Sequence, residues 1–285
     1  METYESCYRF EKITYTDGLF NKSIDATYII HLEGNGRLDN INKQLSEYHI
    51  TNTVYILFNK GFKKCKKELK LQRSDYDLID ANITIFKHSN LEKYSNILVL
   101  EDDFIFMPEV KETSNINNIN SFLNKNINND FMYCIGILPF ITIPYDLNNN
   151  YVLGTGTHAC IFSKRFRYRI IKNAYNIDDW DIYHIKYSLI NFNKITYKEI
   201  LCYQPVTQTE NSKNWNISPI ISNTFINIFK LDTNPKDGTL DLYKISKILS
   251  LILFIFVLFI IYRIILFFNE NKYFKYSSIK YKVKK

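Results

Sequence analysis

The feature that most restricts the fold is an apolar run near the C-terminus, residues 248–268, in which Arg263 is the single charge. At about 1.5 Å per residue, a helix of about 21 residues spans roughly 31 Å, the thickness of a bilayer core. Arg263 lies near one end, where its side chain can reach the interface. A buried core helix is the alternative, but a segment apolar on all its faces favours the membrane. We therefore predict a single C-terminal transmembrane helix over residues 247–268.

The two flanks of this helix give opposite indications about its orientation. The Lys-rich tail, residues 269–285, carries six Lys against one Glu and is expected on the cytosolic side. The first fifteen residues contain no apolar segment typical of a signal peptide, which would place the main domain in the cytosol, as in a tail-anchored protein. We favour the tail-anchored arrangement and leave the topology open.

The net charge of +7 describes the tail more than the domain. Six Lys minus one Glu leave +5 of that total in residues 269–285, so the rest of the chain is close to neutral. This distribution argues against a nucleic-acid partner. The five cysteines are scattered, without a CxxC pair or a zinc-like His/Cys spacing, and we expect them to be reduced.

Apolar runs and helical patterns alternate along residues 25–230, which predicts one α/β domain with a mostly parallel central sheet. Strands are expected at 25–32, 53–58, 97–100, 130–137 and 200–206, and helices at 38–48, 62–71, 75–88, 164–173 and 178–185. The glycine-containing stretch 154–163 is expected to be a loop followed by a short strand, with Ser163 capping the next helix. Residues 1–24 are expected to be an irregular leader, and 231–246 a linker to the membrane helix.

Three adjacent acids, Glu101, Asp102 and Asp103, follow the apolar run ILVL directly and are followed by FIF. Carboxylates beside buried surface are costly unless something neutralises them. Ligands bind at the carboxyl ends of strands in such sheets, and clustered carboxylates there suit Mg²⁺ or Mn²⁺. The alternative to a metal site is an acidic turn exposed to solvent.

Three further segments are candidates with strong ordinary explanations. The segment GTGTHA at 154–159 could approach a ligand closely but is also a plain turn, and His158 could simply be hydrogen-bonded. Asp178 and Asp179 could supply a general base, although an acid at this position is more often a helix cap. The segment QPVTQ at 204–208, with Ser212 and Trp215, could line a sugar site or form a surface turn.

Taken in order, these segments resemble family 25 glycosyltransferases, the group of lipopolysaccharide and collagen β-galactosyltransferases, in forms like the divergent copies of large DNA viruses. The resemblance covers residues 25–215 and rests on four stretches, of which the second is the most specific: TYIIHL, ILVLEDDFIF, GTGTHACIFSK and CYQPVTQ. Two features depart from the family. Arg37 alone stands where the family is Arg-rich, and DAN and KH replace its Gly-Cys and Ser-His.

The resemblance implies a GT-A-like, Rossmann-type sandwich over residues 25–230. It implies transfer of a hexose, with inversion, from a nucleotide sugar, UDP-linked by the same resemblance, to a hydroxyl of a glycan or protein acceptor. It also implies Mn²⁺ or Mg²⁺ as cofactor. By similarity, Asp103 and Glu101 would hold the metal, while Glu101, Asp102 and His31 would lie on the nucleotide side. Asp179, with Asp178 in reserve, would be the catalytic base.

Two other functions fit the same residues. A membrane-anchored binding or virion protein could keep the fold without activity, because the departures fall in regions that would contact donor or acceptor. A metal-dependent phosphohydrolase also uses paired carboxylates, but it would need further ligands, for which the acids of Asp178–Asp181 and His158 are the candidates.

Overall fold

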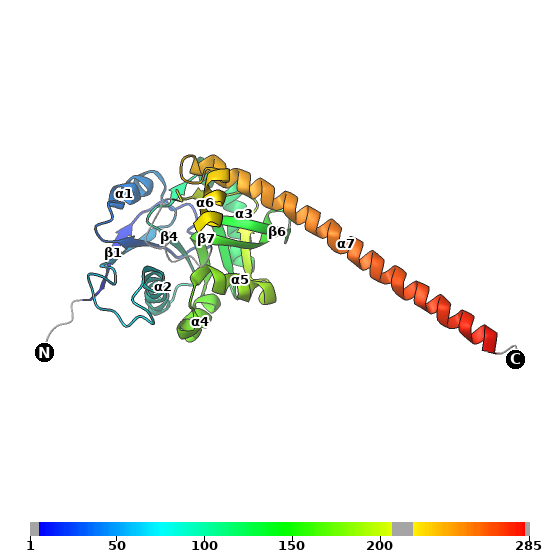
Figure 1. Cartoon of the computed structure of the whole chain (residues 1–285). Helices are drawn as coiled ribbons and strands as arrows, with labels where there is room; N and C mark the ends of the chain where they lie inside the picture. The colour runs from blue at the N-terminus through cyan, green and yellow to red at the C-terminus, as the bar shows by residue number, and fades with distance from the viewer. Residues whose placement is uncertain (1–5, 207–218, 283–285) are drawn as a thin grey trace.

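The structure is a computed structural model that describes residues 6–206 and 219–282. It consists of an α/β domain from which one long helix, α7, projects (Figure 1). A seven-stranded sheet forms the centre of the domain, in the order β1-β3-β2-β4-β7-β6-β8. A second, two-stranded sheet pairs β5 with β9.

Most strands of the central sheet run in one direction. Parallel pairings join β2 to β3 and to β4, and β6 to β8. Because β7 is antiparallel to both β4 and β6, the strands β3, β2, β4, β6 and β8 all point the same way, with β1 and β7 opposed. The strands are β1 (Tyr8–Thr14), β2 (Ala26–Leu32), β3 (Thr53–Asn59), β4 (Asn96–Glu101), β5 (Ile105–Phe106), β6 (Met132–Pro144), β7 (Asn149–Ser163), β8 (Lys194–Tyr197) and β9 (Cys202–Tyr203). The expected α/β domain with largely parallel strands is therefore confirmed.

Helices cover both faces of the sheet. The helices are α1 (Leu38–Glu47), α2 (Ser74–Leu91), α3 (Thr113–Lys125), α4 (Lys164–Asn173), α5 (Trp180–Asn191), α6 (Pro219–Phe229) and α7 (Pro235–Lys282), with short 3-10 turns at Pro108–Lys111 and Ala174–Asn176. Side chains of α1 and α3 pack in one core, and those of α2, α4 and α5 pack in a second. The alternation of strand side chains supplies both cores: Ile29 of β2 points into the first, and its neighbours Tyr28 and Ile30 point into the second.

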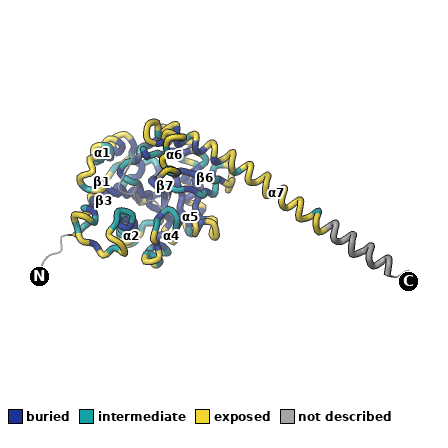
Figure 2. Tube along the Cα trace, in the orientation of Figure 1, coloured by how far each residue is buried: buried dark blue, intermediate teal, exposed yellow. Residues whose placement is uncertain are grey.

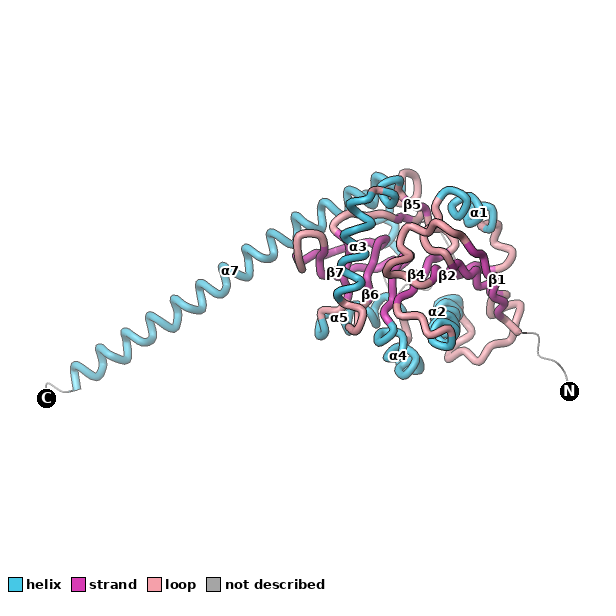
Figure 3. The backbone as a smooth tube through the Cα atoms, turned by 180° about the vertical axis from the view of Figure 1, so that it is seen from behind, coloured by secondary structure: helices cyan, strands magenta, loops and turns pink. Residues whose placement is uncertain are grey.

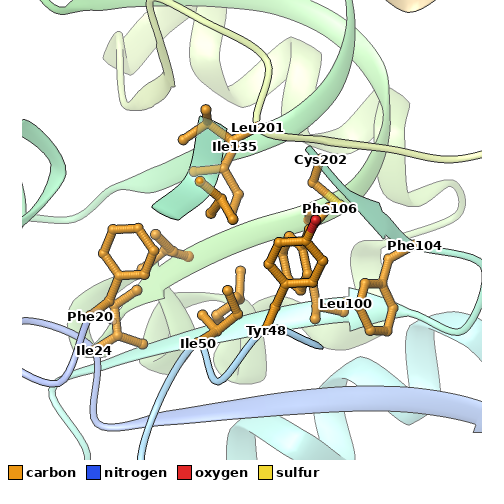
Figure 4. Close-up of a cluster of buried hydrophobic side chains, with 14 of the residues drawn as sticks. Phe20, Ile24, Tyr48, Ile50, Leu100, Phe104, Phe106, Ile135, Leu201 and Cys202 are labelled. Atoms are coloured by element: carbon orange, nitrogen blue, oxygen red, sulfur yellow. The ribbon is translucent and has the colours of Figure 1, made fainter. Parts of the chain in front are cut away.

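The first core lies beneath the acidic end of β4. Figure 4 shows Leu100 of β4 packed among Phe104, Phe106 and Cys202, residues from the chain just beyond that strand and from β9. Buried residues run through the domain, whereas α7 is exposed along its projecting part (Figure 2). The end of β4 is thus held rigidly, and the acids that follow it start from a fixed backbone.

The N-terminal segment corrects one expectation. Instead of an irregular leader, it contains β1, an edge strand antiparallel to β3. Its sequence, YRFEKIT, does alternate apolar and polar residues, and Phe10 stacks on His88 with ring centroids 4.2 Å apart. The alternation is the ordinary pattern of a half-buried strand and could have been recognised.

The helix expected at 62–71 is wrong; turns and irregular backbone occupy this segment. Long-range contacts hold it in that form. Lys67 is buried, with its ammonium paired to Asp77, bonded to Asn59 at 2.5 Å and lying 3.9 Å from the ring centre of Tyr8. One lysine of this Lys-rich segment is therefore a core residue.

The expectation of five reduced cysteines is also wrong. Cys7 and Cys65 form a disulfide between residues 58 apart in the chain. It joins the start of β1 to the irregular segment after β3, so the edge strand and the Lys67 loop are tied together. Cys134, Cys160 and Cys202 are free and buried.

Two more boundaries differ from those expected. The glycine stretch at 154–163 lies inside the long strand β7. The supposed linker at 231–246 is largely helical, because α7 begins at Pro235. Its first turns pack on the domain through Thr239, Leu242, Tyr243 and Ser246, all buried. The helix then continues without a break into the apolar run, so no extended linker separates the two.

Candidate functional site

Asp102 is the anchor of the acidic end of β4. Its carboxylate accepts hydrogen bonds from the backbone amide of Leu32 at 3.1 Å, from Asn35 Nδ2 at 2.6 Å and from Arg37 Nη1 at 2.7 Å. His31 Nδ1 lies farther away, 3.4 Å from Oδ2. Burial alone would raise the pKa of Asp102, but these donors outweigh it and lower the pKa. Asp102 therefore ties the turn after β2 to the end of β4 and is largely satisfied by the protein.

Asp103 lines a cavity. Arg37 Nη1 is 3.0 Å from Asp103 Oδ2, while the second oxygen, Oδ1, is buried without a hydrogen-bond partner among the described residues. Burial raises the pKa of Asp103 to about 6, even though Arg37 lowers it. The adjacent cavity has a volume of about 230 Å³ and is lined by Arg37, Asn40, Asp103, Ile105 and Pro205. One carboxylate oxygen in this wall thus lacks a counterpart.

Glu101 and Asp181 complete the acidic group. Burial, and then the nearby charges of Asp103 and Asp181, raise the pKa of Glu101 well above its ordinary value. Asp181 lies in the first turn of α5, where its carboxylate accepts bonds from Gly156 N at 2.9 Å and Thr157 Oγ1 at 3.1 Å. The site therefore joins the end of β4, the middle of β7 and the start of α5.

From the sequence, Asp181 was a candidate only as a further ligand of a phosphohydrolase, not as a neighbour of Glu101. The segment DDWD contains three acids, and only the helix boundary decides which of them faces β4. Because α5 begins at Trp180, Asp179 becomes its cap and Asp181 turns toward the glycines of β7. The position of Asp181 could have been predicted from the sequence only if the first residue of α5 had been known.

The charges of this group do not balance. Glu101, Asp102, Asp103 and Asp181 could together carry four negative charges, and Arg37 is the cation that pairs with two of them. Burial is the main reason why the pKa of both Glu101 and Asp103 is raised, and the neighbouring carboxylates add to it. Arg37 thus neutralises part of the negative charge of these acids, and the remaining negative charge requires protonation or a bound cation.

Asp178 and Asp179, the expected catalytic pair, have other partners. Asp178 is exposed and bonds to Lys70 at 2.5 Å and to Tyr76 at 3.1 Å. Asp179 is the N-cap of α5, accepting from Ile182 N at 2.8 Å, and burial raises its pKa. The capping interpretation therefore holds for Asp179, and a role as base stays a prediction.

Both histidines of the candidate stretches are buried. His31 packs edge-on against Phe58, with ring centroids 5.4 Å apart, and lies beside Asp102 rather than in the cavity wall. His158 contacts two carbonyl oxygens, Gly156 O at 2.7 Å and Cys202 O at 3.3 Å, and burial lowers its pKa to about 4. His158 is thus a neutral hydrogen-bonded residue at pH 7.

The segment after β9 reaches the same cavity. Pro205 lines it, and Gln204 has a buried Oε1 without a hydrogen-bond partner in the described part of the chain. Thr207, Gln208, Ser212 and Trp215, also candidates from the sequence, lie outside the described residues. Pro205 thus lies in the same cavity wall as Arg37 and Asp103, and a role of QPV in a sugar site stays a prediction.

A divalent cation fits this site only with help from a substrate. Within residues 6–206 and 219–282, no three His, Cys, Asp or Glu side chains are grouped so as to hold a metal by themselves. However, Mg²⁺ and similar ions commonly bind one or two carboxylates together with substrate phosphates. The unpartnered Oδ1 of Asp103 and the surplus charge around Glu101 match that arrangement.

No family model matches the chain, and no curated protein matches it. Among solved structures, A197 from STIV is similar to it with a TM-score of 0.41 and 12% identity, covering 65% of this chain and 86% of that one. A glycosyltransferase involved in the glycosylation of the major capsid of PBCV-1 has a TM-score of 0.38 and 9% identity, covering 66% and 96%. Both TM-scores are below 0.5, so these likenesses assign neither a family nor an activity to the chain.

Proposed function

We propose that the protein is a membrane-anchored glycosyltransferase that moves a hexose from a nucleotide sugar, UDP-linked, to an acceptor hydroxyl with the help of a divalent metal. One observation carries the proposal. The carboxylates of Glu101, Asp103 and Asp181 meet where β4 ends and α5 begins, beside a cavity that Arg37 also lines. The motif resemblance to family 25 supports the same activity.

Each residue of the site has a role in this proposal. Asp103 and Glu101 would hold the metal, and the ion would supply charge neutralisation for the diphosphate leaving group. Asp102 keeps Arg37 oriented, because it bonds to the same Nη1 that reaches Asp103. Arg37, which lines the cavity, is placed to bind a phosphate oxygen as a second cation.

The base that takes the acceptor proton would come from the start of α5. Asp179 is the prediction from the sequence, and Asp181 is the alternative that the geometry adds, since its charge is close enough to raise the pKa of Glu101. Asp179→Ser separates the two roles of Asp179, because serine caps a helix as well as aspartate but cannot accept the proton. Loss of about 100-fold or more in kcat with this variant, and an unchanged melting temperature, would identify Asp179 as the base.

The proposal is tested by calorimetry with UDP in the presence and absence of Mn²⁺. We expect UDP binding to require Mn²⁺ and to weaken at least tenfold in Asp103→Asn, while Asp178→Asn, at an exposed surface pair, binds as the wild type does. Equal binding without metal would contradict the proposal. No heat at millimolar UDP would favour the inactive binding protein instead.

A panel of UDP-sugars then separates transfer from phosphate hydrolysis. We expect slow release of free sugar and UDP from one or a few donors, since water can replace a missing acceptor. Release of inorganic phosphate from simple phosphate esters would instead support the alternative that the protein is a phosphohydrolase.

A further inference from the structure

One face of the domain exposes an unusual number of large apolar side chains. We call it the hairpin face, formed by the turn between β6 and β7 and by the C-terminal end of α5. Leu147 at the tip of the turn is 95% exposed and Ile190 is 79% exposed. The exposed apolar residues of the hairpin face are Phe140, Ile143, Tyr145, Leu147, Leu189, Ile190 and Phe192.

The two parts of the hairpin face are continuous. Tyr145 contacts Tyr151 with ring centroids 5.0 Å apart, and Tyr151 contacts Phe192 at 5.6 Å. Phe192 ends α5 in the left-handed conformation, with φ of 49°, a position usually taken by glycine or asparagine. A bulky aromatic residue is thus kept at a strained backbone position, from which it joins this surface.

The apolar helix leaves the domain beside this surface. Thr142 N, in β6, donates a hydrogen bond to Ser250 Oγ at 2.8 Å. Ser250 is the third residue of the apolar run 248–268, about 3 Å along the helix axis from its start. Figures 1 and 3 show α7 passing the β6–β7 end of the domain as it departs, with α5 on the same side.

We propose that the hairpin face docks on the surface of the lipid bilayer in which α7 is anchored. The inference rests on the proposed membrane span, but not on glycosyl transfer. Where α7 enters a bilayer, residues that are bonded to its first apolar turn must lie at the headgroup level. Tyrosine is enriched at that level, as Tyr145 and Tyr151 would be here. Phe and Leu side chains, such as Phe192 and Leu147, bury at the boundary between headgroups and acyl chains.

Lipid explains this surface better than a protein partner does. The hydrogen bond from Thr142 N to Ser250 Oγ ties the hairpin face to the start of the apolar run. Lipid therefore meets this face as soon as α7 spans the membrane, without a further binding event. The domain does not bury the apolar part of α7, and no other part of the described structure covers this part of the helix. The contact is apolar in origin, so we expect it to depend little on salt or on anionic lipid.

The test uses the full chain reconstituted in lipid nanodiscs, with one cysteine introduced at a time and labelled with the environment-sensitive dye NBD. Leu147→Cys and Ile190→Cys probe the hairpin face, and Phe259→Cys probes the middle of the apolar run. Leu91→Cys is the matched control, an 81% exposed leucine on α2, which lies across the domain from the point where α7 departs (Figure 1). The unmodified chain gives the background from native cysteines.

We expect the dyes at Leu147 and Ile190 to shift to shorter wavelength and to be quenched several-fold more by shallow spin-labelled lipids than the dye at Leu91. If the dye at either position behaves like that at Leu91 while deep spin-labelled lipids quench the dye at Phe259, the docking inference is wrong and the span stands. If deep spin-labelled lipids do not quench the dye at Phe259, the span and the docking both fail. Quenching at Leu147 that depends on protein concentration but not on spin-labelled lipid would indicate a second copy and also overturn the inference.

Discussion

Asp102 and Asp103 are neighbours of the same residue type, yet the protein treats them in opposite ways. Asp102 receives three hydrogen bonds and its pKa is lowered, whereas Asp103 keeps an unpartnered buried oxygen and its pKa is raised to about 6. The carboxylate of Asp102 therefore supports the folded state, and that of Asp103 opposes it when no cation is bound.

For Asp103, the folded state holds its proton more tightly than the unfolded state, so stability falls as pH rises from about 4 to about 6. Asp103→Asn removes this charge. We expect the variant to be more stable than the metal-free wild type at pH 7.5, by on the order of 1–3 kcal/mol, with a flatter pH dependence between 4 and 6. Urea denaturation at several pH values measures both effects, and lower stability at pH 7.5 would contradict the assignment.

For Asp102, the lowered pKa means that its contribution is present at neutral pH and lost as pH falls through the folded-state value. Asp102→Asn keeps one acceptor oxygen for Leu32 and Asn35, but turns an NH₂ group toward the guanidinium of Arg37. We expect a loss of about 2–3 kcal/mol at pH 7 that shrinks toward pH 3. The same urea titration measures it, with Asp103→Asn as the variant of opposite sign.

At this scale the sequence predicts where the acids are but not what each one does. The ILVLEDDFIF motif identified the end of a buried strand, and the structure has β4 there. The partners of Asp102 come from the turn after β2, about 70 residues earlier, and no local pattern shows which acid they reach. The position of Asp181 beside Glu101 depends on where α5 begins, which the local pattern of acids does not determine.

Among the elements, α4 combines apolar packing in the second core with one buried arginine that bonds to neighbouring elements. Arg167 is fully buried and bonds to Tyr94 O at 2.6 Å, Phe162 O at 2.7 Å and Ser95 O at 3.1 Å, and to Asn90 Oδ1 at 3.3 Å. No acid pairs with it in the described residues, and burial lowers its pKa to about 10. Arg167 thus joins α4 to the turn that connects α2 and β4.

Replacing Arg167 by Met keeps much of its volume but leaves these carbonyls without donors. We expect Arg167→Met to lower the free energy of unfolding by about 3–5 kcal/mol, because several buried acceptors lose their partner at once. Arg165→Met, two residues away on the exposed side of α4, is the control and should change stability by less than about 0.5 kcal/mol. Thermal melting of both variants gives the comparison, and similar melting temperatures would refute this role.

Elements with a strong local pattern were predicted well. The helix that begins after Ser163 has the expected bounds, and Ser163 accepts a bond from Phe166 N as an N-cap. The segment around Lys67 was mispredicted because its conformation depends on Asp77 and Cys7, which are distant in sequence. Residue periodicity carries no information about such contacts.

At the scale of the whole molecule, the Cys7–Cys65 disulfide bears on topology. Disulfides persist in oxidising compartments, whereas thiols stay reduced in the cytosol. With α7 spanning a membrane, a domain on the oxidising side leaves the Lys-rich tail on the cytosolic side, as positively charged flanks prefer. This arrangement differs from the tail-anchored one favoured by the sequence.

We therefore expect the domain to be protected from protease in sealed membranes. In denaturant, a maleimide-PEG reagent should modify three cysteines without prior reduction and five after it, matching three free cysteines and one disulfide. Five modified cysteines without reduction, or digestion of the domain in sealed membranes, would restore the tail-anchored topology. Cys7→Ser with Cys65→Ser should show no change on reduction.

The apolar run predicted a membrane helix, and α7 is long and apolar enough to cross a membrane, with none of its apolar part buried in the domain. The sequence did not predict that the same helix would begin inside the domain. The buried residues of its first turns, Thr239, Leu242, Tyr243 and Ser246, do follow a helical spacing. The Asp, Asn, Pro and Gly residues of 231–241 favoured a linker instead.

The unbroken course of α7 from the domain into the apolar run has a mechanical consequence. Because no flexible linker separates α7 from the domain, tilting of the helix in the lipid would turn the cavity near Asp103 with it. The size of the domain would then fix how far from the membrane this cavity can lie. If the protein transfers a sugar as proposed, its acceptors would have to diffuse laterally in the same leaflet or lie close above it, so encounters would be two-dimensional. Inserting a flexible glycine segment between the buried first turns and the apolar run would release that restriction.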